Sequence, residues 1–374
     1  MAKAVVLGAG LVGSVIAKDM AKDFDVTVVD LNEQALSKFD DIRNVNTVKA
    51  SVIDPESITP IIKDADVVCG AVPGSIGYRM LKTVINSGKS ICDISFMPED
   101  FRKLEYDAKI NGVTVIPDMG VAPGMSNLLV GRAAHLLEEV KDVAIYVGGL
   151  PERPKPPFNY KIVFSLEGAL DEYIRPVHCV VNGNVKEVEA LTGIEEIDFS
   201  EVGKLEAFYT DGLRSLMYNI KAENMLEKTL RYPGYANIMS AFKSIGLLSD
   251  EYRRLAAKLL FPVWEMKPEE GDRDITVMKI IVSGRKEYDK VTYEWYLFDR
   301  FDKDKWLHSM ARTTGFPCAI VARLIAGNKF SEAGVFAPEM LASNDVIFRY
   351  IIDQLAERGV HFREKIVVEK GYFK

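Results

Sequence analysis

Cysteine and histidine are scarce in this sequence, and no hydrophobic run is long. The four cysteines are Cys69, Cys92, Cys179 and Cys318. None belongs to a CxxC pair, so they are predicted to be reduced core thiols of a cytoplasmic protein. The four histidines stand apart without the spacing of metal ligands, and no metal site is expected.

Other absences narrow the class of protein. No apolar run approaches the roughly 20 residues that cross a bilayer, so no membrane association is expected. The first residues already read as a strand, which predicts that no signal peptide precedes the domain. The net charge of −7 includes no basic block, which argues against nucleic acid as a partner. A GxSxG elbow is also missing, which argues against the serine hydrolases that use one.

What is present favours a large soluble enzyme. The 374 residues are enough for two domains of ordinary size, and a hydrophobic content of 48% supports sizeable cores. The expected partner is therefore a small molecule.

A glycine-rich loop near the N-terminus organises the chain. An apolar run over residues 4–7 predicts a buried strand, residues 14–20 predict a helix, and residues 26–30 predict a second strand. Between the first strand and the helix lie Gly8, Ala9, Gly10, Leu11, Val12 and Gly13. This order of strand, loop, helix and strand is typical of a dinucleotide-binding unit. The alternative is a glycine turn in another kind of α/β unit.

Each glycine of the loop has a physical role in that interpretation. Gly8 permits a tight turn, Gly10 lets the backbone approach a pyrophosphate, and Gly13 lets helix and strand pack closely. Asp30 ends the second strand, where its carboxylate can accept hydrogen bonds from both ribose hydroxyls. Because a 2′-phosphate would meet that carboxylate, the sequence predicts NAD as cofactor in preference to NADP.

The remaining pattern predicts a Rossmann domain followed by an α+β domain. Strands and helices alternate through residue 118, as in a doubly wound parallel sheet. We therefore expect an NAD-binding domain over residues 1–125. A long helix is expected over 126–140, and antiparallel strands such as 276–283 and 291–298 follow. Residues 126–330 are predicted to form a substrate-binding and dimerisation domain with a mixed or antiparallel sheet, and residues 331–374 to return to the first domain.

Ligands in an open parallel sheet bind beyond the carboxyl ends of its strands. Three predicted strands end in candidate segments there. Ala71, Val72 and Pro73 follow the fourth strand, where their backbone can pass beneath the nicotinamide ribose. Asp93 ends the fifth strand and Asp118 the sixth, so these acids can hold an amine or move a proton. The alternatives are a plain turn for the first segment and loop or helix-cap hydrogen bonds for the two acids.

The second domain supplies candidate substrate ligands. Thr229 and Arg231 precede a Pro-Gly turn, and an arginine there can hold a carboxylate through two parallel hydrogen bonds. Asp211 and Arg214 offer a second acid and a second arginine. For both segments the alternative is a structural ion pair.

Several segments together resemble the saccharopine dehydrogenase-like family along nearly the whole chain. They are the glycine loop and residues 93–99, 118–127 and 228–234. Within that family, residues 146–151 and 210–215 are most similar to the branch of L-lysine 6-dehydrogenases. The saccharopine-forming branch typically has an aspartate where this chain has Ala122, and several relatives have histidine at Tyr235.

The resemblance implies NAD-dependent oxidative deamination of the side-chain amine of L-lysine. It implies that the 6-semialdehyde and ammonia are the products, that Asp93 or Asp118 holds the amine or assists water, and that Arg231 anchors the α-carboxylate. A homodimer formed through the second domain is also expected, with residues 291–298 pairing or stacking across a two-fold axis. The alternatives are a saccharopine or carboxynorspermidine dehydrogenase, which joins an amine to a carbonyl compound, and an NAD-binding regulator without turnover.

Overall fold

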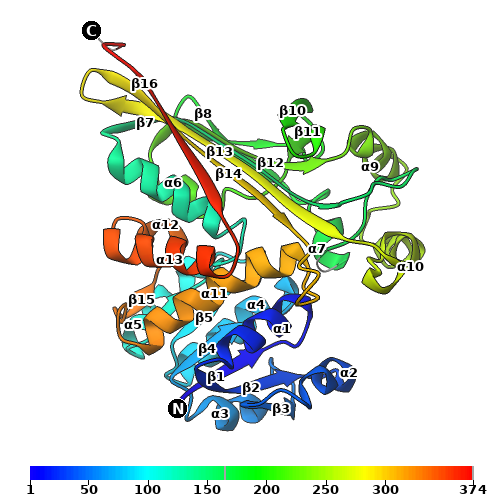
Figure 1. Cartoon of the computed structure of the whole chain (residues 1–374), viewed down its shortest axis with the longest axis vertical. Coiled ribbons are helices and arrows are strands. Elements are labelled where there is room, and N and C mark those ends of the chain that lie inside the picture. The colour runs from blue at the N-terminus through cyan, green and yellow to red at the C-terminus, as the bar shows by residue number, and fades with distance from the viewer. Residues whose placement is uncertain (164–165, 373–374) are drawn as a thin grey trace. The chain divides into compact units, whose positions relative to one another are not determined.

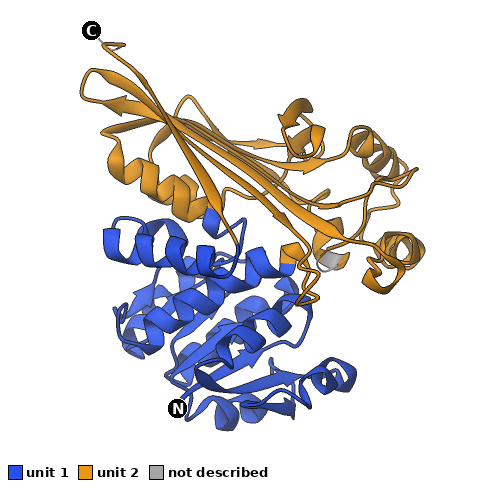
Figure 2. Cartoon of the chain, viewed as in Figure 1, with its two compact units in different colours: residues 1–125, 311–359 blue, residues 126–310, 360–374 orange. Residues whose placement is uncertain are grey.

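The computed structural model describes residues 1–163 and 166–372. The chain divides into two compact units (Figure 2). Unit 1 comprises Met1–Met125 and Ala311–Gly359, and unit 2 comprises Ser126–Met310 and Val360–Lys374.

Unit 1 is built on a parallel sheet of seven strands (Figure 1), in the order β15-β6-β5-β4-β1-β2-β3. The strands are β1 (Ala2–Leu7), β2 (Phe24–Asp30), β3 (Val45–Lys49), β4 (Val67–Gly70), β5 (Ile91–Asp93), β6 (Thr114–Ile116) and β15 (Gly334–Val335). The order of β1 to β6 is that of a Rossmann sheet, in which β2 and β3 lie on one side of β1 and β4 to β6 lie on the other. The predicted doubly wound fold is thus confirmed.

Helices connect these strands. They are α1 (Leu11–Met20), α2 (Glu33–Leu36), α3 (Pro55–Ile62), α4 (Gly74–Asn86), α5 (Glu105–Ile110), α11 (Ser309–Ala326), α12 (Pro338–Leu341) and α13 (Asp345–Glu357), with 3₁₀ turns at Ser37–Phe39 and Phe101–Leu104. β-Branched residues fill the central strands, and their side chains are buried as expected for strands covered on both faces.

One buried carboxylate joins the C-terminal helices to α1. Asp19 accepts hydrogen bonds from Arg323 Nη1 at 2.8 Å and from Arg358 Nη2 at 3.0 Å. Lys22 adds a third cation at 2.6 Å. These charges outweigh the effect of burial and hold the pKa of Asp19 below its usual value. The arginines lie on α11 and beyond the end of α13, so this contact stabilises the return of the chain to unit 1.

Unit 2 contains a nine-stranded mixed sheet. Its main path is β10-β11-β12-β7-β13-β14-β16; β8 pairs with β12, and β9 pairs with β8. The strands are β7 (Glu139–Pro151), β8 (Val177–Val181), β9 (Asn184–Val188), β10 (Glu195–Phe199), β11 (Gly203–Tyr209), β12 (Ala222–Arg231), β13 (Asp274–Lys286), β14 (Asp289–Arg300) and β16 (Phe362–Glu369). Only β7 and β12 are parallel neighbours along this path.

The helices of unit 2 are shorter than the long strands that they accompany (Figure 1). They are α6 (Met125–Leu136), α7 (Leu166–Asp171), α8 (Leu216–Asn219), α9 (Tyr235–Ser244) and α10 (Arg253–Trp264), with a 3₁₀ turn at Pro268–Glu270. Aromatic side chains from α9, α10 and the segment before α7 form one core cluster around Trp264.

The structure corrects several predictions for the second half. The helix expected over 126–140 ends at Leu136, because β7 begins at Glu139 and pairs with both β12 and β13. Strands β10, β12 and β16 were not predicted. The segment that returns to unit 1 is Ala311–Gly359 where 331–374 was expected, because β16 pairs with β14 in unit 2. Residues 291–298 were expected to pair or stack across a two-fold axis. They lie in β14, which is paired with β13 on one edge and with β16 on the other, so it has no free edge for strand pairing with a second subunit. Of the two expected contacts, only stacking remains a prediction.

No helix within the described ranges is both long enough and apolar enough to cross a membrane.

Candidate cofactor and amino-acid sites

The glycine loop of unit 1 has the geometry that close backbone packing requires. Gly8 has a φ of +108°, and a Cβ on it would lie 2.2 Å from the carbonyl oxygen of Ala71. A Cβ on Gly13 would lie 2.0 Å from the carbonyl oxygen of Gly8. By contrast, a Cβ on Gly10 would meet no atom within 4 Å. Gly8 and Gly13 therefore serve packing, whereas Gly10 keeps open space above the loop.

Asp30 fixes the loop from the end of β2. Its Oδ2 accepts a hydrogen bond from the N–H of Ala9 at 2.7 Å, and its Oδ1 accepts one from the N–H of Asn32 at 2.8 Å. Helix α1 begins directly after Gly10, which has no capping side chain, so its first amides can bind an anion. A dinucleotide site needs a carboxylate for the ribose, a glycine that leaves room for the pyrophosphate, and the N-terminus of a helix. Asp30, Gly10 and α1 supply these groups, so a nucleotide cofactor fits these residues.

The segment Ala71, Val72 and Pro73 lies beside that loop. The N–H of Ala71 donates to the carbonyl oxygen of Leu7 at 2.8 Å, and Pro73 precedes α4. The structure thus brings the predicted fourth-strand turn next to the glycine loop.

Asp93 and Asp118 also lie together within unit 1. Asp93 is fully buried, and its two oxygens accept hydrogen bonds from the hydroxyl of Ser95 at 2.8 Å and from the N–H of Ser95 at 3.0 Å. Burial raises the pKa of Asp93 to about 7, and the charge of Asp118 contributes to the rise. The carbonyl of Asp93 accepts from the N–H of Met119, which ties the two strand ends together. A carboxyl group with this pKa can exchange protons near neutral pH.

A second polar cluster occupies one face of β12 in unit 2. Side chains alternate along a strand, so Glu227, Thr229 and Arg231 share that face. All three are buried. The hydroxyl of Thr210 lies 2.7 Å from Glu227 Oε2 and 2.9 Å from the hydroxyl of Thr229.

Arg231 is enclosed by aromatic rings and one carboxylate. Its Nη2 donates to Glu172 Oε2 at 3.2 Å and to the hydroxyl of Tyr173 at 3.3 Å, and its Nη1 donates to the carbonyl of Leu230. Its guanidinium carbon lies 4.8 Å from the centre of the Tyr160 ring. Arg231 thus already has a buried ion pair, which is the structural alternative that the sequence left open. A substrate carboxylate bound there would share or replace Glu172.

The other predicted substrate ligands lie in the loop after β11. Asp211 Oδ1 is 3.8 Å from His178 Nδ1, and the charge of Asp211 contributes to the raised pKa of Glu227. Arg214 has a φ of +53° and precedes α8. Asp211 and Thr229 therefore join the surroundings of Glu227.

Glu227, Glu172 and Tyr160 were missed by the sequence analysis. Glu227 had no clear signal, because Lys228 beside it is also charged and the segment shows no polar–apolar alternation. Glu172 and Tyr160 come from distant segments and carry no such pattern either.

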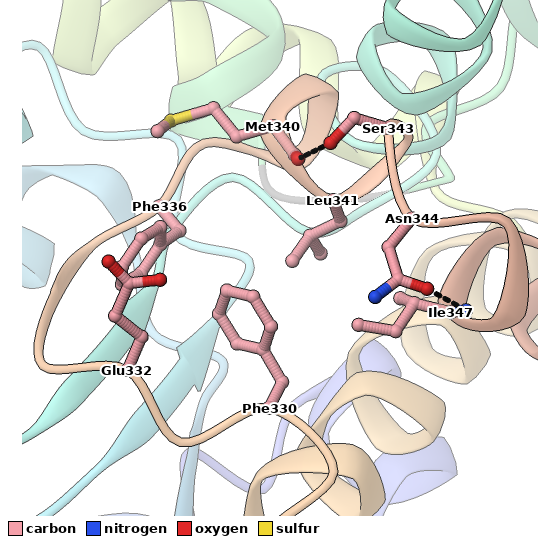
Figure 3. Close-up of a pocket in the computed structure, with 8 residues that line it drawn as sticks. All are labelled: Phe330, Glu332, Phe336, Met340, Leu341, Ser343, Asn344 and Ile347. Carbon is pink, nitrogen blue, oxygen red and sulfur yellow. Dashed lines mark hydrogen bonds between the residues drawn. The ribbon is translucent and has the colours of Figure 1, made fainter.

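A cavity in unit 1 involves none of the predicted site residues. It is lined by residues between Phe330 and Ile347, with Phe330, Phe336 and Leu341 among them (Figure 3). Asn344 at its wall caps helix α13 by accepting from the N–H groups of Val346 and Ile347.

Comparison with known families decides the class of the protein. Residues 120–360 match the model of the saccharopine dehydrogenase C-terminal domain, and residues 4–116 match that of the saccharopine dehydrogenase NADP binding domain. The chain belongs to the saccharopine dehydrogenase family. Unit 1 accordingly carries the nucleotide-binding domain of an oxidoreductase family.

Relatives of this family differ in length and in chemistry. The chain is 26% identical over 266 residues to a mitochondrial alpha-aminoadipic semialdehyde synthase of Mus musculus, covering 67% of this chain but only 29% of that protein. It is 26% identical over 274 residues to an L-glutamate-forming saccharopine dehydrogenase of Saccharomyces cerevisiae, covering 68% of this chain and 60% of that protein. A carboxyaminopropylagmatine dehydrogenase of Synechocystis is 21% identical, with 98% of both chains covered.

A solved structure shows the same fold. The apo saccharopine dehydrogenase of Saccharomyces cerevisiae superposes with a TM-score of 0.80 at 19% identity, covering 98% of this chain and 100% of that one.

Proposed function

We propose that this protein catalyses NAD-dependent oxidative deamination of the side-chain amine of L-lysine, giving the 6-semialdehyde and ammonia. The observation that carries the proposal is the cluster of ionisable side chains at the β12 face of unit 2. Buried Arg231 and Glu227 lie on that face, and Glu172, a partly exposed residue that follows α7, pairs with Arg231. L-Lysine carries one carboxylate and two amines, so its charges complement this cluster. Saccharopine also carries two amines but has three carboxylates, for which this cluster offers a single arginine.

Residues of the chain have distinct tasks in this reaction. NAD, when bound, accepts the hydride that leaves the ε-carbon. The glycine loop and Asp30 hold the cofactor, and Arg231 binds the α-carboxylate of the amino acid. Asp93, whose pKa lies near 7, takes the proton that the ε-ammonium must lose before hydride transfer and can return it as ammonia leaves. Water adds to the resulting imine, and carbon–nitrogen cleavage releases ammonia and the aldehyde.

Asp30 supports NAD as the cofactor. Its carboxylate ends β2 and is held by the N–H groups of Ala9 and Asn32, where a 2′-phosphate would be repelled. The matched domain model bears the name of an NADP binding domain, so cofactor choice is part of the proposal.

A second candidate is reductive coupling of an amine with a carbonyl compound. The names of the relatives favour it, because the matched proteins include saccharopine and carboxyaminopropylagmatine dehydrogenases. Ala122 favours the lysine reaction over saccharopine chemistry, because a neutral methyl stands where the saccharopine-forming branch typically has an aspartate.

One assay separates the two reactions. L-Lysine and NAD should give NADH and an equal amount of free ammonia with no keto acid added. NADH oxidation that requires an amine together with 2-oxoglutarate would replace this proposal with the coupling reaction. An NADH signal that responds to no amine, amino acid or keto acid, in a protein that still binds NAD, would favour a regulator.

We also propose that the protein is a homodimer. Unit 2 is the proposed dimerisation unit, and light scattering at micromolar concentration should give twice the mass of 41.8 kDa. A monomeric mass would contradict this.

A further inference from the structure

We propose that Glu227 binds the α-ammonium group of the substrate, so that the buried face of β12 recognises both charged groups of an α-amino acid. This inference rests on the proposed amino-acid chemistry of unit 2 and extends it to a residue with no assigned role. Arg231 would take the α-carboxylate, and Glu227, four positions earlier on the same strand, would take the neighbouring ammonium.

The carboxyl group of Glu227 lies in a buried polar environment. The side chain is buried, and its Oε2 lies 2.7 Å from the hydroxyl of Thr210. That hydroxyl is 2.9 Å from Thr229, which stands between Glu227 and Arg231 on the strand face. Two hydroxyls next to a carboxyl group can orient it and also accept hydrogen bonds from an ammonium.

The loop after β11 closes around the same carboxyl group. A Cβ on Gly212 would lie 2.4 Å from the carboxyl carbon of Glu227 and 2.6 Å from Oε2. A side chain at position 212 would therefore displace the carboxyl group, and glycine keeps it in place.

A buried donor nearby lacks an acceptor. Among the residues that the structure describes, Nε of Arg231 is buried and has no hydrogen-bond acceptor. The guanidinium and the Tyr160 ring are in contact. Buried donors without partners are costly, and the carboxylate of a bound amino acid would supply the acceptor.

The charge state of Glu227 depends on a ligand. Burial raises its pKa to about 8, with Glu172 and Asp211 adding to the rise and Thr210 and Arg231 opposing it. At pH 7 the carboxyl group is therefore largely protonated in the empty site. A bound ammonium favours the ionised form, so the proton of Glu227 should be released when an α-amino acid binds.

Kinetics with two substrates test the assignment. 6-Aminohexanoate has the carboxylate and reacting amine of L-lysine but lacks the α-amine. Glu227→Gln should lower kcat/KM for L-lysine by about 100-fold, as expected for removing one partner of a buried charge pair, and leave that for 6-aminohexanoate within about twofold. An equal loss for both compounds would overturn the inference.

Glu206→Gln is the matched control. Glu206 is also a buried glutamate, paired in register with Arg231, but its oxygens accept from the N–H groups of Gly234 and Ala236 and so hold the start of α9. This variant should lower the melting temperature and affect both compounds alike. Selective loss of L-lysine turnover in this variant as well would argue against a specific role of Glu227.

Calorimetry without cofactor makes the test independent of turnover. At pH 7, L-lysine and L-glutamate should each release about one more proton than 6-aminohexanoate, measured in buffers of different ionisation enthalpy, and Glu227→Gln should abolish the difference. If L-lysine is not oxidised but this release occurs, the proposed reaction fails and the ammonium site stands. If neither amino acid shows a release that depends on Glu227, the site is refuted whatever the reaction.

Discussion

A Cβ atom on Gly70 would lie 2.1 Å from Oδ1 of Asp93, the residue paired with it across β4 and β5. The carboxyl group of Asp93 thus occupies the space that a side chain at Gly70 would fill. Ser95 donates hydrogen bonds to both oxygens of this group. The same packing sets both the position and the pKa of Asp93, because it orients the carboxyl group and also excludes water from it.

Gly70→Ala should move this carboxylate. The added methyl group would also meet Met80 at 2.6 Å, so we expect a loss of about 1–3 kcal/mol in the free energy of unfolding from overpacking. Turnover per folded molecule should fall at least tenfold if Asp93 moves the proton. Thermal unfolding and kcat measured on one preparation check this, and unchanged kcat would remove Asp93 from the reaction.

Asp93→Asn should alter stability in a manner that depends on pH. The folded-state pKa of about 7 lies above the ordinary aspartate pKa of 3.8, so the folded protein keeps a proton that the unfolded chain loses between these values. The wild type should therefore lose stability relative to Asp93→Asn as pH rises from about 4 to about 7, by roughly 2–4 kcal/mol in all. Denaturant unfolding at pH 5 and pH 8 measures it, and a pH-independent difference would contradict the assignment.

Gly10→Ala and Gly13→Ala should separate binding from folding. At Gly13 a Cβ would clash with the backbone of Gly8, so this variant should unfold at lower temperature. At Gly10 a Cβ meets nothing, so the melting temperature should stay within a few degrees while NAD affinity falls by about tenfold or more, because the methyl group blocks the pyrophosphate. Fluorescence titration with NADH provides the affinity. NAD binding that survives in Gly10→Ala would argue against the dinucleotide site.

Asp30→Ala should narrow the preference for NAD over NADP. The wild type should bind NAD more tightly, because the carboxylate favours ribose hydroxyls and repels a 2′-phosphate. The substitution also removes the acceptor for the N–H of Ala9, so affinity for both cofactors should fall, by about tenfold more for NAD. Equal or better use of NADP by the unaltered protein would refute NAD as the cofactor.

Arg231→Ala should lower kcat/KM for L-lysine by a few powers of ten, as expected for loss of about 2–4 kcal/mol from a buried charge pair. NAD affinity should be nearly unchanged, and Arg231→Lys should recover only part of the rate, because an ammonium cannot make the planar two-point contact.

The ion pair with Glu172 requires a control for that result. Arg231→Ala leaves the Glu172 carboxylate without its guanidinium, so the melting temperature should drop as well. Combining it with Glu172→Gln should restore stability but not turnover. Turnover that recovers together with stability would make Arg231 a structural residue.

The sequence alone determined those features of this protein that depend on residues close together in the chain. The glycine loop, Asp30 and the strand ends at Asp93 and Asp118 follow from runs of about thirty residues in which strand, turn and helix alternate. Parallel strands impose a common edge on their carboxyl ends, so a local pattern was enough to place these residues.

Tertiary structure decided what depends on distant contacts. Strand β12 carries so many polar residues that its pattern resembles an exposed segment. Glu227 and Arg231 are nevertheless buried, because β11 and β7 flank the strand. Tyr160 and Glu172 also cover the guanidinium of Arg231. The return of Ala311–Gly359 to unit 1 likewise requires Arg323 and Arg358 to meet Asp19. Burial raises the pKa of Glu227 and ion pairing lowers that of Asp19, and both effects arise between residues far apart in the chain, so no local pattern could reveal them.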